Sequence, residues 1–209
     1  MFSDCLLYAE DDGVIGMIKT YYRILKYDQK GKLIKDTGLI VSHSYVIQFL
    51  EIIEGLFSRS NPAVTATDVA NAESIIVGLN NTNSYGRVDA AVGDDTYGIV
   101  IGTNAGVSAE DNEDYALDTK ILNGAGGGQL NYQAVTFVVP RAVGPNIDFD
   151  VLRTFVNASG GTITVKEIGI IIKNTDDTKY HLLLRDVVAD EPVDDAETLT
   201  VIYTLRTTA

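Results

Sequence analysis

Acidic side chains gather in one short stretch of the chain, residues 108–115, which reads Ser-Ala-Glu-Asp-Asn-Glu-Asp-Tyr. Carboxylates are the hard oxygen ligands that calcium prefers, but the Asp-x-Asp-x-Asp-Gly spacing of an EF-hand is absent. The stretch is therefore interpreted as a solvated loop or the start of a short helix. Glu110, Asp111 and Asp114 are the residues to test if a metal is found.

Histidine and serine do not form a recognisable hydrolytic site. His43 and His181 are the only histidines, and the chain has no Gly-x-Ser-x-Gly nucleophile elbow. His181 opens an apolar stretch, which favours a packing or sheet-edge role. Two carboxylates for glycoside cleavage are available among 29 acidic residues, but their number does not place any two of them at one site. A glycosidase therefore ranks behind the binding functions considered below.

A glycine-rich run at residues 124–128 resembles a phosphate-binding loop only superficially. No Lys-Ser or Lys-Thr pair follows it, and the residues from Leu130 onward predict a strand instead of the helix that such a loop requires. The run is interpreted as a flexible turn. The sequence thus predicts no catalytic residue, no cofactor and no metal ligand, and we do not expect an enzyme.

Composition narrows the classes of partner. The 209 residues include 16 Lys plus Arg against 29 Asp plus Glu, for a formal net charge of −13. Such a chain is not expected to bind nucleic acid directly, because that requires clustered cations, and it is not expected to bind anionic membranes. Cys5 is the only cysteine, so no intrachain disulfide is possible, which fits synthesis in a reducing cytoplasm. No basic-then-apolar leader and no apolar run near the ~20 residues of a membrane span is evident.

Four strand signals separated by short polar turns occupy residues 151–206, and such short connections favour antiparallel neighbours. In the last signal, apolar residues at 199, 201, 203 and 205 alternate with polar ones, which predicts one core-facing side. In the second, Ile163 and Val165 have one parity and the isoleucines at 168, 170 and 172 the other. A β-bulge near Lys166 and Glu167 would bring both sets inward. Gly169 alternatively marks a close backbone approach.

The N-terminal part predicts an arm, a hairpin and a helix. Residues 1–13 are interpreted as an arm, and residues 14–27 and 33–41 as two strands joined by a turn in which Gly31 adopts positive φ. The hairpin is rich in cations, and Lys26, Lys30 and Lys32 are candidate interface residues for an acidic partner, with a solvated strand face as the alternative.

The helix is predicted to begin at Ser44 and to end before Pro62. Its apolar residues recur at three- and four-residue intervals and leave only a narrow polar stripe, so we expect it to be nearly surrounded. The candidate interface residues on it are Tyr45, Phe49, Ile53 and Phe57.

The middle of the chain is less regular. Residues 63–78 are ambiguous between a short helix beginning at Thr67 and a strand at 74–77, whereas 97–102 has the composition of a buried strand. A strand at 130–140 is expected to be partly buried on both faces and to be closed by Pro140 and Pro145.

These elements predict a mainly β fold: an antiparallel, jelly-roll-like β-sandwich with an N-terminal β-hairpin and one packed α-helix. The expected organisation is an arm at 1–13, the hairpin and helix at 14–60 and the sandwich at 61–209, together forming one structural domain.

Several of these stretches together resemble a recurrent type of tailed-bacteriophage virion structural protein. The stretches that carry the resemblance are residues 44–50, 97–103, 114–117, 121–124, 129–132, 153–169, 184–187 and 198–206. The resemblance implies a non-enzymatic component that oligomerises, attaches to other virion proteins of the capsid, neck or tail, and resides in a virion assembled in the host cytoplasm. The alternative is a phage receptor-binding or carbohydrate-binding β-sandwich module that uses the loops at 80–86 and 107–118.

Overall fold

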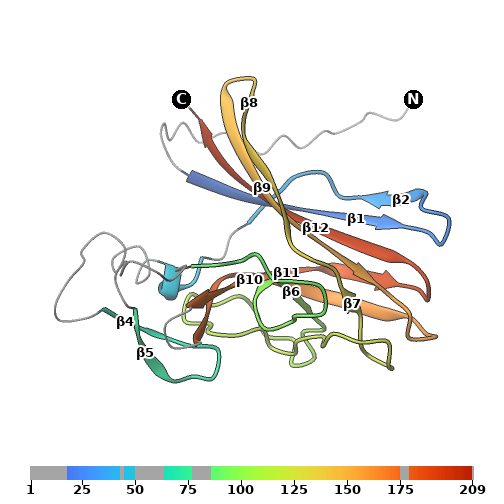
Figure 1. Ribbon diagram of the computed structural model, residues 1–209, viewed down its shortest axis with the longest axis horizontal. Coiled ribbons are helices and arrows are strands. Elements are labelled where there is room, and N and C mark those ends of the chain that lie inside the picture. The colour runs from blue at the N-terminus through green and yellow to red at the C-terminus, as the bar shows by residue number, and fades with distance from the viewer. Residues whose placement is uncertain (1–17, 43–44, 50–63, 77–85, 175–178, 209) are drawn as a thin grey trace.

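The computed structural model describes residues 18–42, 45–49, 64–76, 86–174 and 179–208, and strands dominate these residues (Figure 1). All of the strand pairs within its sheets are antiparallel. The prediction of a mainly β, sandwich-like fold with antiparallel sheets is therefore confirmed.

The first sheet joins the beginning and the end of the chain. Its strands follow the order β2-β1-β12-β9-β7, with β3 paired to β1 and β8 paired to β9. Their bounds are β1 Ile18–Tyr27, β2 Leu33–Asp36, β3 Ile40–Val41, β7 Asn131–Tyr132, β8 Thr136–Val143, β9 Asn146–Val156 and β12 Thr198–Thr208. Because β1 pairs with β12 over its whole length, the N-terminal hairpin is an integral part of this sheet.

The second sheet has three strands in the order β11-β10-β6, and a separate two-stranded ribbon pairs β4 with β5. Their bounds are β4 Val64–Thr67, β5 Glu73–Ile76, β6 Gly98–Gly102, β10 Ile163–Asn174 and β11 Lys179–Val193. The chain crosses between the two larger sheets from β9 to β10 and again from β11 to β12. The four C-terminal strands predicted from the sequence thus contribute to both layers.

The main apolar core fills the space between these sheets, and a small second cluster joins Ala66 of β4 to Ile172 of β10. From the first sheet, Leu199, Val201 and Tyr203 of β12 and Val151 and Phe155 of β9 point into the main core; from the second, β6 is buried along its whole length. The side chains with no exposed surface include Ile99, Val100, Ile101, Phe155, Val165, Ile168, Leu182, Leu199, Val201 and Tyr203. Because these alternating side chains are buried, the alternation of apolar residues in the sequence correctly predicted strands with a core-facing side.

A register shift lies where the sequence predicted a bulge in β10, but the extra residues belong to β11. Val165 pairs with Glu191 and Glu167 with Val187, so a single residue of β10 lies opposite three residues of β11. The parity of β10 therefore does not change at the shift, and its isoleucines of both parities are buried because both faces of this strand are covered. The close approach at Gly169 exists, since a Cβ there would lie 2.8 Å from the carbonyl oxygen of Leu184.

The ambiguity at residues 63–78 is resolved in favour of strand. β5 spans Glu73–Ile76, and no helix begins at 67–68, because Thr67 ends β4 and Asp68 accepts hydrogen bonds from the turn that follows. Two details of the predicted elements are wrong. The partner strand of the hairpin is split into β2 and β3 by a bend at Gly38, where φ is +67°. The strand expected at 130–140 is also split, and its second half, β8, continues through Pro140 and is exposed along nearly its whole length.

Helix is confined to residues 47–49 among those described. Tyr45 and Phe49 pack their rings against each other with centroids 4.4 Å apart, and the Tyr45 hydroxyl contacts that of Thr20 on β1. The predicted continuation of the helix, with Ile53 and Phe57, lies outside the described residues, as does the arm at 1–13.

Candidate functional site

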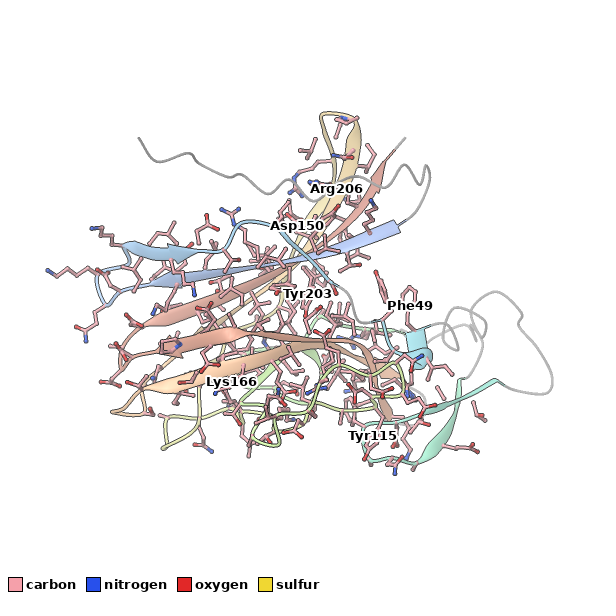
Figure 2. The ribbon with its side chains drawn as sticks, turned by 180° about the vertical axis from the view of Figure 1, so that it is seen from behind. Phe49, Tyr115, Asp150, Lys166, Tyr203 and Arg206 are labelled. Carbon is pink, nitrogen blue, oxygen red and sulfur yellow. The ribbon has the colours of Figure 1, made fainter. Side chains whose placement is uncertain are left out.

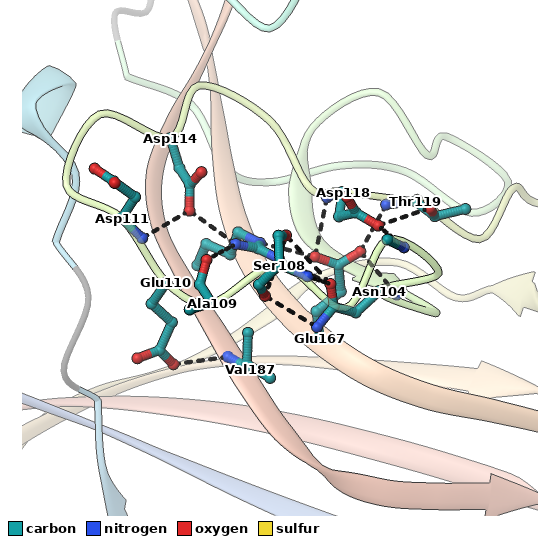
Figure 3. A network of polar contacts seen from close by, with 12 residues as sticks. Asn104, Ser108, Ala109, Glu110, Asp111, Asp114, Asp118, Thr119, Glu167 and Val187 are labelled. Carbon is teal, nitrogen blue, oxygen red and sulfur yellow. Dashed lines mark hydrogen bonds and ion pairs between the residues drawn. The ribbon is translucent and has the colours of Figure 1, made fainter.

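The acidic stretch at 108–115 serves as an anchor for its own loop. Arg185, on β11, is 1% exposed and donates hydrogen bonds to the Asp114 carboxylate at 2.8 Å, the Ser108 hydroxyl at 2.8 Å and the Ala109 carbonyl at 3.0 Å (Figure 3). Burial alone would lower the pKa of Arg185, but its hydrogen bonds to Glu167 and Asp114 outweigh burial and raise that pKa. The guanidinium therefore stays charged and holds the loop on the sheet.

Glu167, on the neighbouring strand β10, completes this anchor from a fully buried position. Its carboxylate accepts the Arg185 Nε–H at 2.8 Å and the backbone N–H groups of Thr119 at 2.8 Å and Asp118 at 3.0 Å (Figure 3). Glu167 lies beside the register shift between β10 and β11 and pairs with Gly102 of β6, the residue that precedes the loop. The pair is thus a structural ion pair whose remaining acceptor capacity is used by loop amides.

A second buried arginine, Arg153 on β9, was not predicted. It has no exposed surface, and it donates to the carbonyls of Gln133, Tyr97, Ile99, Ala91 and Asp94 at 2.5–3.1 Å while stacking 4.7 Å from the Tyr132 ring centroid. Burial lowers its pKa. All of the guanidinium N–H groups are used in these hydrogen bonds, so none is left to bind a ligand. Arg153 instead holds backbone of neighbouring segments against the first sheet.

The remaining candidates for chemistry are also occupied. His181 is fully buried, with Nδ1 3.3 Å from the Thr67 carbonyl oxygen, which agrees with a packing role; His43 lies outside the described residues. In the part of the chain that the structure describes, no group of three or more His, Cys, Asp or Glu side chains is arranged to hold a metal ion.

The structure separates the predicted basic interface residues from one another. Lys26 is largely covered, donates to the Pro192 carbonyl at 2.9 Å and lies 3.5 Å from the Glu197 carboxylate. Lys30 and Lys32 are exposed at the tip of the hairpin, where Lys30 lines a hollow of about 350 Å³ together with acidic residues of the same chain. The positive charge predicted for docking is therefore partly neutralised within the subunit.

Tyr45 and Phe49 border a small cavity that is also lined by residues of the acidic stretch at 108–115. The cavity has a volume of about 440 Å³ and is lined by Tyr45, Val46, Ile47, Phe49, Asn112 and Glu113. The backbone N–H of Ile47 donates to the Asn112 carbonyl at 2.8 Å, which holds the two segments together. An apolar wall with an amide and a carboxylate at its rim suits a small ligand or one side chain of a partner.

Among the described residues, the end of the first sheet has no second sheet over its core-facing side (Figure 1). The hairpin of β8 and β9, the end of β12 and the start of β1 extend beyond the second sheet, and Figure 2 shows Asp150 and Arg206 there and Tyr203 between the sheets. Along β9 the core-facing residues become progressively exposed: Val151 is 3% exposed, Phe149 is half-buried and Ile147 is 49% exposed. We give the name overhang face to the surface formed by Phe137, Ile147, Phe149 and Leu205. The strand register places all four on the same side of the sheet as the buried residues Val151 and Tyr203.

The opposite side of the overhang is polar and internally neutralised. Arg206 donates two hydrogen bonds of 2.7 Å to Asp148, and Arg141 donates one of 2.6 Å to Asp150. The hydrogen bonds from Arg206 lower the pKa of Asp148. The overhang is therefore amphipathic, with paired charges on one side and apolar side chains on the other.

The edges of the first sheet are blunted against strand addition. At one edge, β2 and β3 have only four and two residues and are separated by the bend at Gly38. At the other, β8 contains Pro140, which has no N–H, and its register shifts between Val138 and Arg141. Because short strands, prolines and bulges hinder edge pairing, a partner is expected to meet the overhang face instead.

Sequence reasoning missed the overhang face because the alternation of apolar residues is the same whether or not a second sheet covers them. For the same reason, the strand at 130–140 was predicted to be partly buried on both faces, whereas the apolar residues of β8 are mostly exposed.

Comparison of the chain with known protein families, curated proteins and solved structures finds no match in any of the three. Among the described residues, no helix is both long and apolar enough to cross a membrane.

Proposed function

We propose that this protein is a non-enzymatic structural subunit of a tailed-phage virion, which oligomerises and attaches to the capsid, neck or tail. The single observation that carries the assembly role is the overhang face. Phe137 and Ile147 are 43% and 49% exposed although they continue the core-facing rows of the sheet. Contiguous apolar surface of this kind marks a contact with another protein. The assignment to a phage particle rests on the sequence resemblance.

The buried polar residues support a structural role. Arg185, Glu167 and Arg153 use their hydrogen-bonding groups to fasten loops to the sheets, so these buried charged side chains maintain the shape of the subunit. A subunit whose buried charged groups all have hydrogen-bond partners, and whose overhang face is not covered by the other described residues, is suited to association with its neighbours.

The test combines solution mass with particle composition. Light scattering coupled to size exclusion is expected to show an oligomer, and mass spectrometry of purified particles of the encoding phage is expected to detect the chain. A Phe137→Ser/Ile147→Ser variant loses roughly 1 kcal/mol of burial per side chain, so its dissociation constant should rise at least about tenfold.

The matched control is Val92→Ser/Val107→Ser, because these valines are 67% and 83% exposed in loops away from the overhang. It should assemble like the wild type. A wild-type protein that stays monomeric at high concentration and is missing from the particles would contradict the proposal.

The cavity beside Tyr45 favours a second candidate, a receptor-binding or carbohydrate-binding module, because it joins an aromatic pair to Asn112 and Glu113 of the 107–118 loop. Glycan-array binding that is lost in Asn112→Ala and Glu113→Gln variants, but kept in the Phe137→Ser/Ile147→Ser variant, would support this candidate over the first.

A further inference from the structure

The overhang face lies beside the point where the described part of the chain begins. Ile18, the first residue of β1, pairs with Thr207 of β12, and Thr207 pairs with Ile147 of β9. Residues 1–17 precede this point and lie outside the described part. The described part of the chain therefore begins two strands away from Ile147 of the overhang face.

The composition of residues 1–17 suits an apolar face with a polar surround. The segment contains Met1, Phe2, Leu6, Leu7, Tyr8, Val14, Ile15 and Met17 as apolar or aromatic residues, and its acids are Asp4, Glu10, Asp11 and Asp12. Fully extended, 17 residues span about 55–60 Å, which far exceeds the width of the few strands that make up the overhang. Length therefore does not prevent the segment from reaching a neighbouring copy.

We propose that the N-terminal segment, residues 1–17, of a second copy of this chain covers the overhang face. The proposal rests on the proposed function and names the occupant of its assembly surface. A second copy is favoured because the other described residues of the chain leave the face exposed and because the blunted sheet edges leave the face as the place of contact. If two overhangs meet about a two-fold axis, Ile18 of each copy lies next to the overhang face of the other. Each N-terminal segment then begins inside the contact, and each copy covers the overhang face of the other.

The lone cysteine of the chain, Cys5, provides a direct test, since it lies in the proposed segment. One protein is the wild type, which carries Cys5; the other is a tagged Cys5→Ser/Ile147→Cys variant, whose single thiol lies on the overhang face. The two are mixed and treated with a short bismaleimide, and chains of different size are separated under denaturing conditions. The expected result is a mixed adduct between the two chains, at least fivefold more abundant than in the control.

The control is a tagged Cys5→Ser/Val107→Cys variant, because Val107 is more exposed than Ile147 but lies in a loop outside the overhang. Equal yields of mixed adduct for the two variants would overturn the proposal. An Ile147→Cys chain that retains Cys5 and links only within itself, independently of concentration, would also overturn it and would assign the face to the segment of the same chain.

Light scattering on the same samples separates the two levels of inference. An oligomer without the mixed adduct contradicts the occupant and leaves the structural-subunit function standing, whereas a monomer without the adduct contradicts both.

Discussion

At the residue scale, the main determinant of the 103–119 region is the buried pair of Arg185 and Glu167. We expect Arg185→Met to lower the free energy of unfolding by about 3–5 kcal/mol, because it leaves the Glu167 carboxylate buried beside no cation. Urea denaturation measures the change. Arg87→Gln is the matched control, since Arg87 and its partner Asp89 are both exposed, and a loss of less than about 0.5 kcal/mol is expected there.

A double substitution distinguishes an ion pair from a wider anchor. If Glu167 were only a counterion, Arg185→Met/Glu167→Met would recover most of the lost stability. Glu167 also accepts the N–H groups of Thr119 and Asp118, so we expect the double variant to remain destabilised by at least about 2 kcal/mol. Full recovery in the urea midpoint would show that these amides contribute little.

The paired charges on the polar side of the overhang predict a pH dependence. Hydrogen bonds from Arg206 lower the pKa of Asp148 in the folded state below the usual value of about 3.9, so this pair stabilises the fold above that pH. As the pH falls through the lowered pKa, the folded carboxylate becomes protonated and the contribution is lost.

Asp148→Asn is therefore expected to cost about 1–2 kcal/mol near pH 7, and its difference from the wild type should shrink as the pH falls below about 4. Urea midpoints measured across this range provide the check. Asp190→Asn is the control, because the Asp190 side chain is 67% exposed next to Lys166; an unchanged difference at all pH values would contradict the assignment to Asp148.

At the element scale, glycines allow the loops to lie directly on the second sheet. A Cβ at Gly102, the last residue of β6, would contact the Glu167 carboxylate and lie 2.6 Å from the Thr119 carbonyl oxygen. We expect Gly102→Ala to destabilise the protein by about 1–3 kcal/mol, measured by urea denaturation, because the buried anchor has no room to move.

Gly161→Ala is the matched control for this prediction. No atom lies within 4 Å of a Cβ at Gly161, and its φ is not in the left-handed region. A change within about 0.5 kcal/mol is expected, and equal losses at the two glycines would show that the contact with Glu167 and Thr119 is not the cause of the loss at Gly102.

The elements that sequence could predict are those whose signal is local. The alternation in β12 follows from side-chain geometry, so this strand was predicted correctly. The parity change in β10 instead reflects burial of both faces of that strand, since the extra residues at the register shift belong to β11. The end of β8 was not predicted correctly, because Pro140 is tolerated on an edge strand whose N–H side has no ladder partner. The burial of Arg153 was missed as well, since its five carbonyl partners lie in β6 and in loops that the sequence does not bring together.

At the scale of the whole molecule, the two candidate contact surfaces respond to salt in opposite ways. Each copy carries a formal net charge of −13, so copies repel one another wherever they meet. The overhang face has no charged side chain, and contact through it gains apolar burial against this repulsion. Docking of Lys30 and Lys32 onto an acidic surface would instead gain from opposite charges.

Raising the ionic strength from about 0.01 M to about 0.15 M shortens the Debye length from about 30 Å to about 8 Å and screens both effects. If the overhang face is the contact, we expect the dissociation constant of the oligomer to fall at least about threefold over this range, because repulsion weakens while apolar burial does not. A Lys30→Gln/Lys32→Gln variant should follow the same trend. Sedimentation equilibrium at several salt concentrations measures the constant, and a rise with salt that disappears in the lysine variant would move the contact from the overhang to the basic hairpin.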